Sequence, residues 1–417
     1  MAQSVLGSLT LGYRPLWNRA RALAGLQLHV HADDDGIDGR HLLRTLAELW
    51  TAESPGLLLS PSSRRLAAGL LAHADRAGPA IDVPLDWLDD TALRNTAQSA
   101  RQRGAHVLVS ATPDGFAAEA ARMPGAANVA RWAGRLGVQL TPTDAAGAMQ
   151  AALRARSAAA GGRMAGRAED SPIAVDMLVD GVASRALAEH ALDQQGAWAV
   201  AGWPVEDVLH RYAGNPLPLS RRAIVQAMNA IDAEQSLDRI ELMFGQEPSL
   251  AYQLMLYMNS AGLGLRNGVA SLRNGFMMLG FRALNSWLSE QLPQATEDAN
   301  LRPVNLAMVL RGHLMEHLMD AGIEDDLRRE VYTCGLFAQL DLVLDEPLRT
   351  SFARIPLSER ILSATMSGTG PYAPSLQVAF ALESADPTAV RTLRRSYEMG
   401  TEDINRALLR TLAALPR

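Results

Sequence analysis

The spacing of apolar residues changes once along this 417-residue chain, near Tyr212. Before that point short apolar runs alternate with helical patterns, and after it the patterns are helical throughout. Alternating strands and helices build a parallel sheet with helical crossovers, so the first part is expected to be doubly wound or a barrel. The predicted fold class is therefore α/β plus all-α, in two domains.

The apolar runs of the first part are short enough to be strands. Strands are predicted at residues 9–13, 25–30, 56–60, 80–85, 106–111 and 173–179, with helices over 39–51, 64–74 and 90–103 between them. After a proline-marked linker, helices are predicted at 220–232, 236–244, 249–260, 271–278, 281–291, 303–320, 325–344 and 357–366. The expected domains are residues 8–212 and 220–417, with the linker at 213–219.

Composition excludes several classes of protein. The sequence contains no lysine, so P-loop enzymes and Schiff-base enzymes are excluded. Its net charge of −6 gives no indication of a nucleic-acid partner. The single cysteine, Cys334, cannot form an intrachain disulfide and fits a reducing compartment. With neither a signal-peptide pattern nor an apolar run of eighteen residues, a cytoplasmic protein without a membrane span is expected.

The stretch from Pro248 to Leu288 predicts one helix, a glycine break and two further short helices. Three runs within it are similar to the D-P-x-L helix, the N-S-A turn and the S-I-x-x-A-x-x-x-L-G helix of HDOD domains: Glu247-Pro248-Ser249-Leu250, Asn259-Ser260-Ala261, and Ser271-Leu272 through Leu279-Gly280. The resemblance covers about residues 216–380 and implies a helical domain related to HD phosphohydrolases but without their metal site. The signature positions, expected to be structural, are Pro248, Leu250, Asn259, Ser260, Leu279 and Gly280.

Two departures from this pattern are Glu247 for the usual aspartate and Gly275 for the usual alanine. Gly275 is expected to weaken its helix by roughly 0.5–1 kcal/mol. The sequence has no His-Asp dipeptide, and apolar Phe337 and Ala338 stand where that metal-binding pair would be expected. Neither side chain can bind a hard cation, so an HD-type metal site is not expected.

The first part resembles, more weakly, the EAL-type cyclic di-GMP phosphodiesterase barrel, a domain that often precedes an HDOD domain in bacteria. LGYRPLWN (11–18), GLQLHVH (25–31) and GAWAVAGWP (196–204) are similar to its first, second and last strand motifs. This implies a degenerate TIM-type barrel over about residues 8–212. The family's functional positions then fall on Gln27, His31, Leu58, Asp82, Ser110, Ala111, Ala183 and Ala201.

These positions have lost nearly all the carboxylates that active members use to hold two divalent ions. Gln27 replaces the glutamate of the signature, and the family's catalytic lysine is absent. Asp82 alone could still bind a cation, and a neutral glutamine is a poor replacement for a carboxylate at such a site. No catalytic, cofactor-binding or metal-binding residue is therefore expected.

Two short motifs suggest metal binding instead. His313 and His317 match H-x-x-E-H, although a zinc site needs a third ligand. His29, His31 and Asp33 match part of H-x-H-x-D, although residues 33–36 are better interpreted as a charged turn.

The overall expectation is a cytoplasmic, non-catalytic bacterial signal-transduction protein that binds other signalling proteins or forms a homodimer. It would need no cofactor and bind neither nucleic acid nor membrane. Two alternatives stay open: a cyclic di-GMP or nucleotide sensor without hydrolysis, and a metal-dependent hydrolase that uses His313 and His317.

Overall fold

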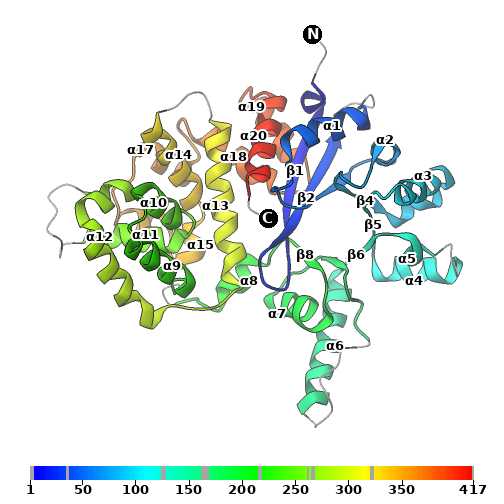
Figure 1. Cartoon of the computed structure of the whole chain (residues 1–417), viewed down its shortest axis with the longest axis horizontal. Coiled ribbons are helices and arrows are strands. Elements are labelled where there is room, and N and C mark those ends of the chain that lie inside the picture. The colour runs from blue at the N-terminus through cyan, green and yellow to red at the C-terminus, as the bar shows by residue number, and fades with distance from the viewer. Residues whose placement is uncertain are drawn as a thin grey trace. The chain divides into compact units, whose positions relative to one another are not determined.

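The computed structural model describes residues 4–33, 37–123, 128–160, 168, 170–214, 218–260, 263, 268–319 and 324–415. The chain divides into two compact units (Figure 1). The barrel unit comprises residues 1–207 together with 381–417, and the helical unit comprises residues 208–380.

The barrel unit contains a closed eight-stranded barrel in which the strands follow one another in chain order. The strands are β1 (Leu9–Trp17), β2 (Leu23–Ala32), β3 (Leu57–Pro61), β4 (Ala80–Pro84), β5 (Val107–Ala111), β6 (Arg135–Gln139), β7 (Leu178–Asp180) and β8 (Ala199–Ala201). A barrel is thus formed rather than a doubly wound sheet. Sequence reasoning missed β6, and it extended β7 too far toward its amino-terminal side.

One strand contradicts the expected parallel sheet. β1 is antiparallel to both of its neighbours, β2 and β8, whereas the pairs from β2 to β8 are parallel. Only residues 18–22 connect β1 to β2, and a parallel crossover needs a dozen residues or more. β1 and β2 therefore form a hairpin, with no helix between them.

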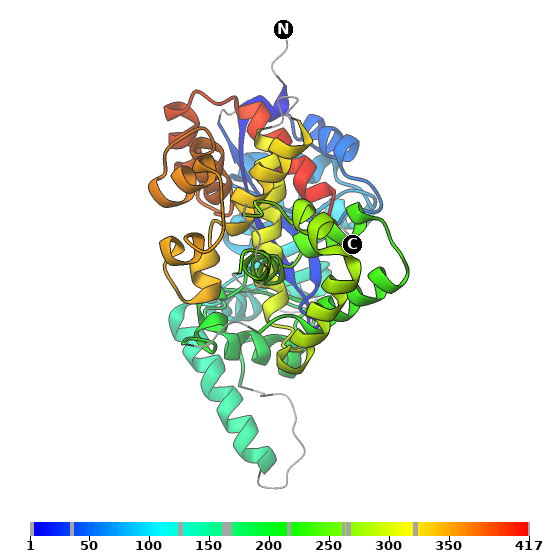
Figure 2. The same cartoon turned by 90° about the vertical axis from the view of Figure 1, so that its left-hand side faces the viewer.

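Helices cover the outside of the barrel. In chain order they are α1 (Gly39–Leu49), α2 (Arg64–His73), α3 (Thr91–Gln102), α4 (Pro113–Arg122), α5 (Val129–Trp132), α6 (Pro142–Ala160) and α7 (Arg185–Glu189); α8 (Val205–His210) follows and crosses from the barrel unit into the helical unit. The side chains of Asp38, Ser63 and Asp90 accept hydrogen bonds from the first free amides of α1, α2 and α3, which explains where these predicted helices begin. Figures 1 and 2 both show α6 projecting from the barrel.

The last two helices, α19 (Thr388–Ser396) and α20 (Thr401–Ala413), belong to the barrel unit. α20 packs against β1 and the 3₁₀ turn at Val5–Ser8. The buried side chain of Asn405 donates hydrogen bonds of 2.8 Å to the carbonyl oxygens of Leu6 and Leu9. Residues 381–417 are thus grouped with the barrel unit, although the sequence led us to expect one helical domain over 220–417, and α20 covers the strand that lacks a crossover helix.

The helical unit consists of helices that follow one another along the chain. They are α9 (Arg221–Asp232), α10 (Leu237–Gly245), α11 (Pro248–Met258), α12 (Leu272–Gln291), α13 (Leu301–Leu318), α14 (Asp325–Phe337), α15 (Leu340–Leu344), α16 (Leu348–Phe352), α17 (Glu359–Leu362) and α18 (Ala373–Leu382), the last of which crosses into the barrel unit. The predicted helix at 325–344 is divided into α14 and α15. No helix within the described ranges is long and apolar enough to cross a lipid bilayer.

The signature positions lie around α11 and α12. Pro248 and Leu250 are buried in the first turn of α11. Asn259 ends that helix: its amide donates to the carbonyl oxygens of Met255 (2.8 Å) and Val269 (3.0 Å), and its oxygen accepts from the Val269 amide (2.8 Å). This one side chain thus joins the end of α11 to the segment that leads into α12.

Two glycines shape α12, one where the helix is interrupted and one where it packs against α11. Gly280, exposed beside the half-buried Leu279, has φ +72° and interrupts α12 where two separate helices were predicted. Gly275 is buried, and a Cβ at this position would overlap the sulfur of Met258. The close approach of Met258 therefore explains a glycine that helix propensity disfavours. Ser260 is exposed, and Ala261 lies outside the described residues.

Candidate functional site at the carboxyl end of the barrel

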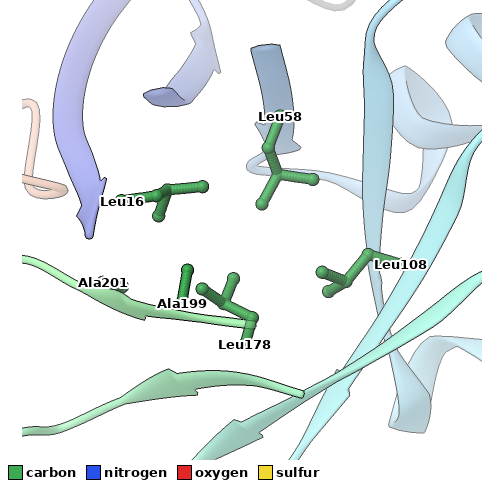
Figure 3. Close-up of a cluster of buried hydrophobic side chains, with 6 residues drawn as sticks. All are labelled: Leu16, Leu58, Leu108, Leu178, Ala199 and Ala201. Atoms are coloured by element: carbon green, nitrogen blue, oxygen red, sulfur yellow. The ribbon is translucent and has the colours of Figure 1, made fainter. Parts of the chain in front are cut away.

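The amino-terminal end of the barrel interior is filled by an apolar layer. Figure 3 shows side chains from five strands pointing toward one another: Leu16, Leu58, Leu108, Leu178, Ala199 and Ala201. Two positions predicted for the functional site, Leu58 and Ala201, belong to this layer and are buried within it. They are packing residues, with no polar atom on the side chain to offer a ligand.

A polar layer lies beyond it, toward the carboxyl ends of the parallel strands. The Gln27 amide donates to the Ser60 hydroxyl (2.9 Å), which donates in turn to a carboxyl oxygen of Asp82 (3.0 Å). Ser110 is buried beside the same carboxyl, outside good hydrogen-bond geometry. The structure thus brings together the predicted positions Gln27, Asp82 and Ser110, and adds Ser60, which sequence reasoning missed.

Burial controls the ionisation of Asp82. Removal from water raises the pKa of this carboxyl to about 6, although the neighbouring Ser110 and Ser60 hydroxyls favour its charged form. The negative charge of Asp180 adds a smaller effect in the same direction as burial. Asp82 is therefore half protonated near pH 6 and mostly ionised at pH 7.

The other charged groups of this layer neutralise one another. Arg14 of β1 makes an ion pair of 2.7 Å with Asp180 at the end of β7. Burial lowers the pKa of His29 to about 4, with smaller contributions from the positive charges of Arg14 and His31. His29 is therefore a neutral imidazole, and the Asp180 carboxylate already has a cationic partner.

The segment after α18 covers the carboxyl end of β2. His31 lies here, with Nε2 2.8 Å from the carbonyl oxygen of Ala385. Arg391 donates two hydrogen bonds to Asp33, of 2.7 and 3.0 Å. Gly12 of β1 allows the backbone of Ser384 to lie close to the strand, because a Cβ at residue 12 would overlap the carbonyl oxygen of Ser384.

The remaining predicted positions do not reach the polar layer. Ala111 follows Ser110 on β5, so its side chain points to the opposite face of the strand. Ala183 is exposed in the segment after β7. The predicted turn at 33–36 lies mostly outside the described residues, although Asp33 is described and pairs with Arg391.

The histidine pair of the helical unit lies on α13. His313 Nδ1 is 2.8 Å from a carboxyl oxygen of Glu316, and its ring contacts that of Tyr332. His317 is half-buried one turn later. Across the described part of the chain, no group of three His, Cys, Asp or Glu side chains is arranged to hold a metal ion.

Comparison with known proteins gives distant sequence relatives. No family model matches the chain. It is 22% identical over 181 residues to the cyclic di-GMP phosphodiesterase CdgJ of Vibrio cholerae, which covers 41% of this chain and 40% of the relative. It is 20% identical over 177 residues to the uncharacterized protein YuxH of Bacillus subtilis, covering 41% of this chain and 43% of the relative. The chain thus spans less than half the length of either relative.

Two solved structures give weak matches in shape. One is the response regulator MmoQ of Methylococcus capsulatus, with a TM-score of 0.38 and 16% identity, covering 47% of this chain and 98% of that one. The other is BlrP1 of Klebsiella pneumoniae in a manganese and cyclic di-GMP complex, with a TM-score of 0.31 and 10% identity, covering 47% of this chain and 55% of that one.

Proposed function

We propose that this protein is a non-catalytic regulator in cyclic di-GMP-related signalling that acts by binding other signalling proteins. In this proposal the barrel unit is a degenerate EAL-like domain and the helical unit is an HDOD-like domain. The distant similarity to a cyclic di-GMP phosphodiesterase supports the signalling context. The composition of the polar layer is the observation that supports the absence of cyclic di-GMP hydrolysis in this proposal.

Hydrolysis of a phosphodiester by two metal ions depends on several carboxylates that bind the ions and orient the attacking water. The polar layer instead presents the hydroxyl of Ser60 and the neutral amide of Gln27, whose nitrogen donates to Ser60 and whose oxygen has no hydrogen-bond partner among the described residues. Its carboxyl groups are Asp82, with a pKa raised to about 6, and Asp180, held by Arg14. A second divalent ion would have to compete with a guanidinium for Asp180.

The HDOD-like assignment is supported by the roles of the signature residues. Asn259 joins α11 to the segment before α12 by two hydrogen bonds with Val269, and Gly280 allows the interruption within α12. These residues maintain the shape of the helical unit rather than contribute to a reaction centre. A helical domain whose motif residues maintain its structure is suited to binding other proteins.

The proposal is tested by incubating the full chain with cyclic di-GMP and either Mg²⁺ or Mn²⁺, and separating the products by chromatography. We expect no hydrolysis above an enzyme-free blank, and no gain from Gln27→Glu alone, because Ser60 and Ser110 supply no carboxylate. An active EAL phosphodiesterase serves as the positive control. Turnover above the blank that disappears in Asp82→Asn would refute the proposal.

A further inference from the structure

A large cavity of about 1600 Å³ opens at the opposite, amino-terminal end of the barrel. Its walls include the residues that immediately precede five of the parallel strands: Gly56, Pro79, His106, Gly134 and Trp198. Leu16, Leu58 and Leu108 of the apolar layer, drawn in Figure 3, also line this cavity. The volume exceeds the roughly 300–1,000 Å³ typical of small-molecule sites.

The charge of this cavity is opposite to that of the whole protein. It is lined by five arginines, Arg40, Arg44, Arg76, Arg101 and Arg135. The acidic residues that line it are Asp38 and Asp75, which leaves an excess of three positive charges with histidine neutral. The chain as a whole carries a net charge of −6, so positive charge is concentrated here. Such a concentration attracts anions.

Arg76 and Arg101 retain uncompensated charge, whereas Arg44 pairs with the exposed Glu48 (3.5 Å), a carboxylate outside the cavity lining. Arg76 is exposed and makes no ion pair with any residue the structure describes. The Arg101 guanidinium is held by the carbonyl oxygens of Ala105 (3.0 Å) and Trp132 (3.3 Å), which fix its position without cancelling its charge. Arg135 pairs with the exposed Asp176 (3.0 Å), an interaction that water screens.

Flat aromatic surfaces accompany the positive charge. The Arg135 guanidinium stacks over the Trp198 ring at 4.0 Å from its centroid. Trp50, also in the cavity wall, is oriented by a hydrogen bond of 2.7 Å from its indole to the carbonyl oxygen of Pro55. Arginine pairs well with phosphate, and an aromatic face or a stacked guanidinium accepts the plane of a base.

We propose that this cavity binds a nucleotide, with phosphates near Arg76 and Arg101 and the base against the Trp50 side of the wall. The site lies at the end of the barrel away from the polar layer, and the inference does not rest on the proposed function. The two ends differ in access: residues 384–391 cover the carboxyl end of β2, whereas the cavity at the amino end is open.

Isothermal titration calorimetry on the full chain tests the proposal, with GTP, cyclic di-GMP and inorganic pyrophosphate as probes. Arg76→Ala removes an exposed guanidinium and Trp50→Leu removes the aromatic surface. Arg65→Ala is the matched control, since Arg65 is an exposed arginine of α2 outside the cavity. Circular dichroism and the thermal midpoint establish that each variant is folded.

At least one nucleotide is expected to bind, and Arg76→Ala to weaken that binding about tenfold or more, the usual effect of losing a charged hydrogen bond. Trp50→Leu should weaken nucleotide binding and leave pyrophosphate binding unchanged, while Arg65→Ala should behave as the natural chain. The proposal is overturned if neither nucleotide binds, if Arg76→Ala and Trp50→Leu leave the affinity intact, or if pyrophosphate binds as tightly as the nucleotides.

Discussion

The assignment of α20 to the barrel unit predicts a specific effect of replacing Asn405 by alanine. This side chain is 1% exposed, and its amide donates to the carbonyl oxygens of Leu6 and Leu9 at 2.8 Å each. Asn405→Ala removes both donors and leaves two carbonyl groups unsatisfied inside the unit. A lost hydrogen bond of this kind costs about 1–2 kcal/mol, so a total of about 2–4 kcal/mol is expected in the free energy of unfolding.

Urea unfolding followed by tryptophan fluorescence can measure this change in the barrel unit. Of the seven tryptophans, only Trp287 lies in the helical unit, so the signal reports mainly on the barrel. The matched control is Arg406→Ala on the same helix, which breaks an exposed pair with Glu402 and should cost only about 0.3–0.5 kcal/mol. A barrel transition that Asn405→Ala shifts no more than this control would contradict the packing of α20 described above.

Two further predictions concern the interiors of the two units. The native pKa of Asp82, about 6, lies above its unfolded value near 3.8, so the native state binds more protons between these values. The stability that this group contributes is thus complete below about pH 4 and is lost as the pH rises through about 6. Asp82→Asn should therefore flatten the fall in the thermal midpoint of the barrel over this pH interval. An unchanged dependence of the midpoint on pH would show that Asp82 ionises normally. In the helical unit, Leu254 is 0% exposed, so Leu254→Ala should lower the free energy of unfolding by about 2–5 kcal/mol. Denaturant unfolding followed by circular dichroism measures this change. A loss below about 1 kcal/mol would show that the buried face of α11 is misplaced.

Local patterns predicted the elements that are regular in sequence and missed the ones that are not. β3 reads as a continuous apolar run and was predicted within one residue, whereas β6 begins with Arg135 and ends with Gln139. That strand is recognisable only through its pairing with β5 and β7, which is information the isolated sequence lacks. The same limit applies to α20, because its amphipathic pattern does not indicate which unit it covers.

The polar layer was predicted in part for a related reason. Alignment to a family motif placed a functional position on Leu58, whereas the structure places Ser60, two residues later on the same face of β3, next to Gln27 and Asp82. Residues two apart on a strand share a face, so the sequence pattern alone cannot decide whether Leu58 or Ser60 lies in the polar layer. The register of β3 against β2 decides it, and register depends on the closed barrel.

Because residues 208–380 are inserted between β8 and α20, the order of synthesis differs from the order of assembly. The ribosome releases all eight strands first, but the helix that seals β1 follows only after the whole insert has been made. Domains generally fold as they emerge, so the insert has time to fold while the barrel is still incomplete. Until α20 has been synthesised, the nascent barrel therefore lacks the helix that packs against β1. During this interval the barrel is most exposed to chaperone binding and to misassembly.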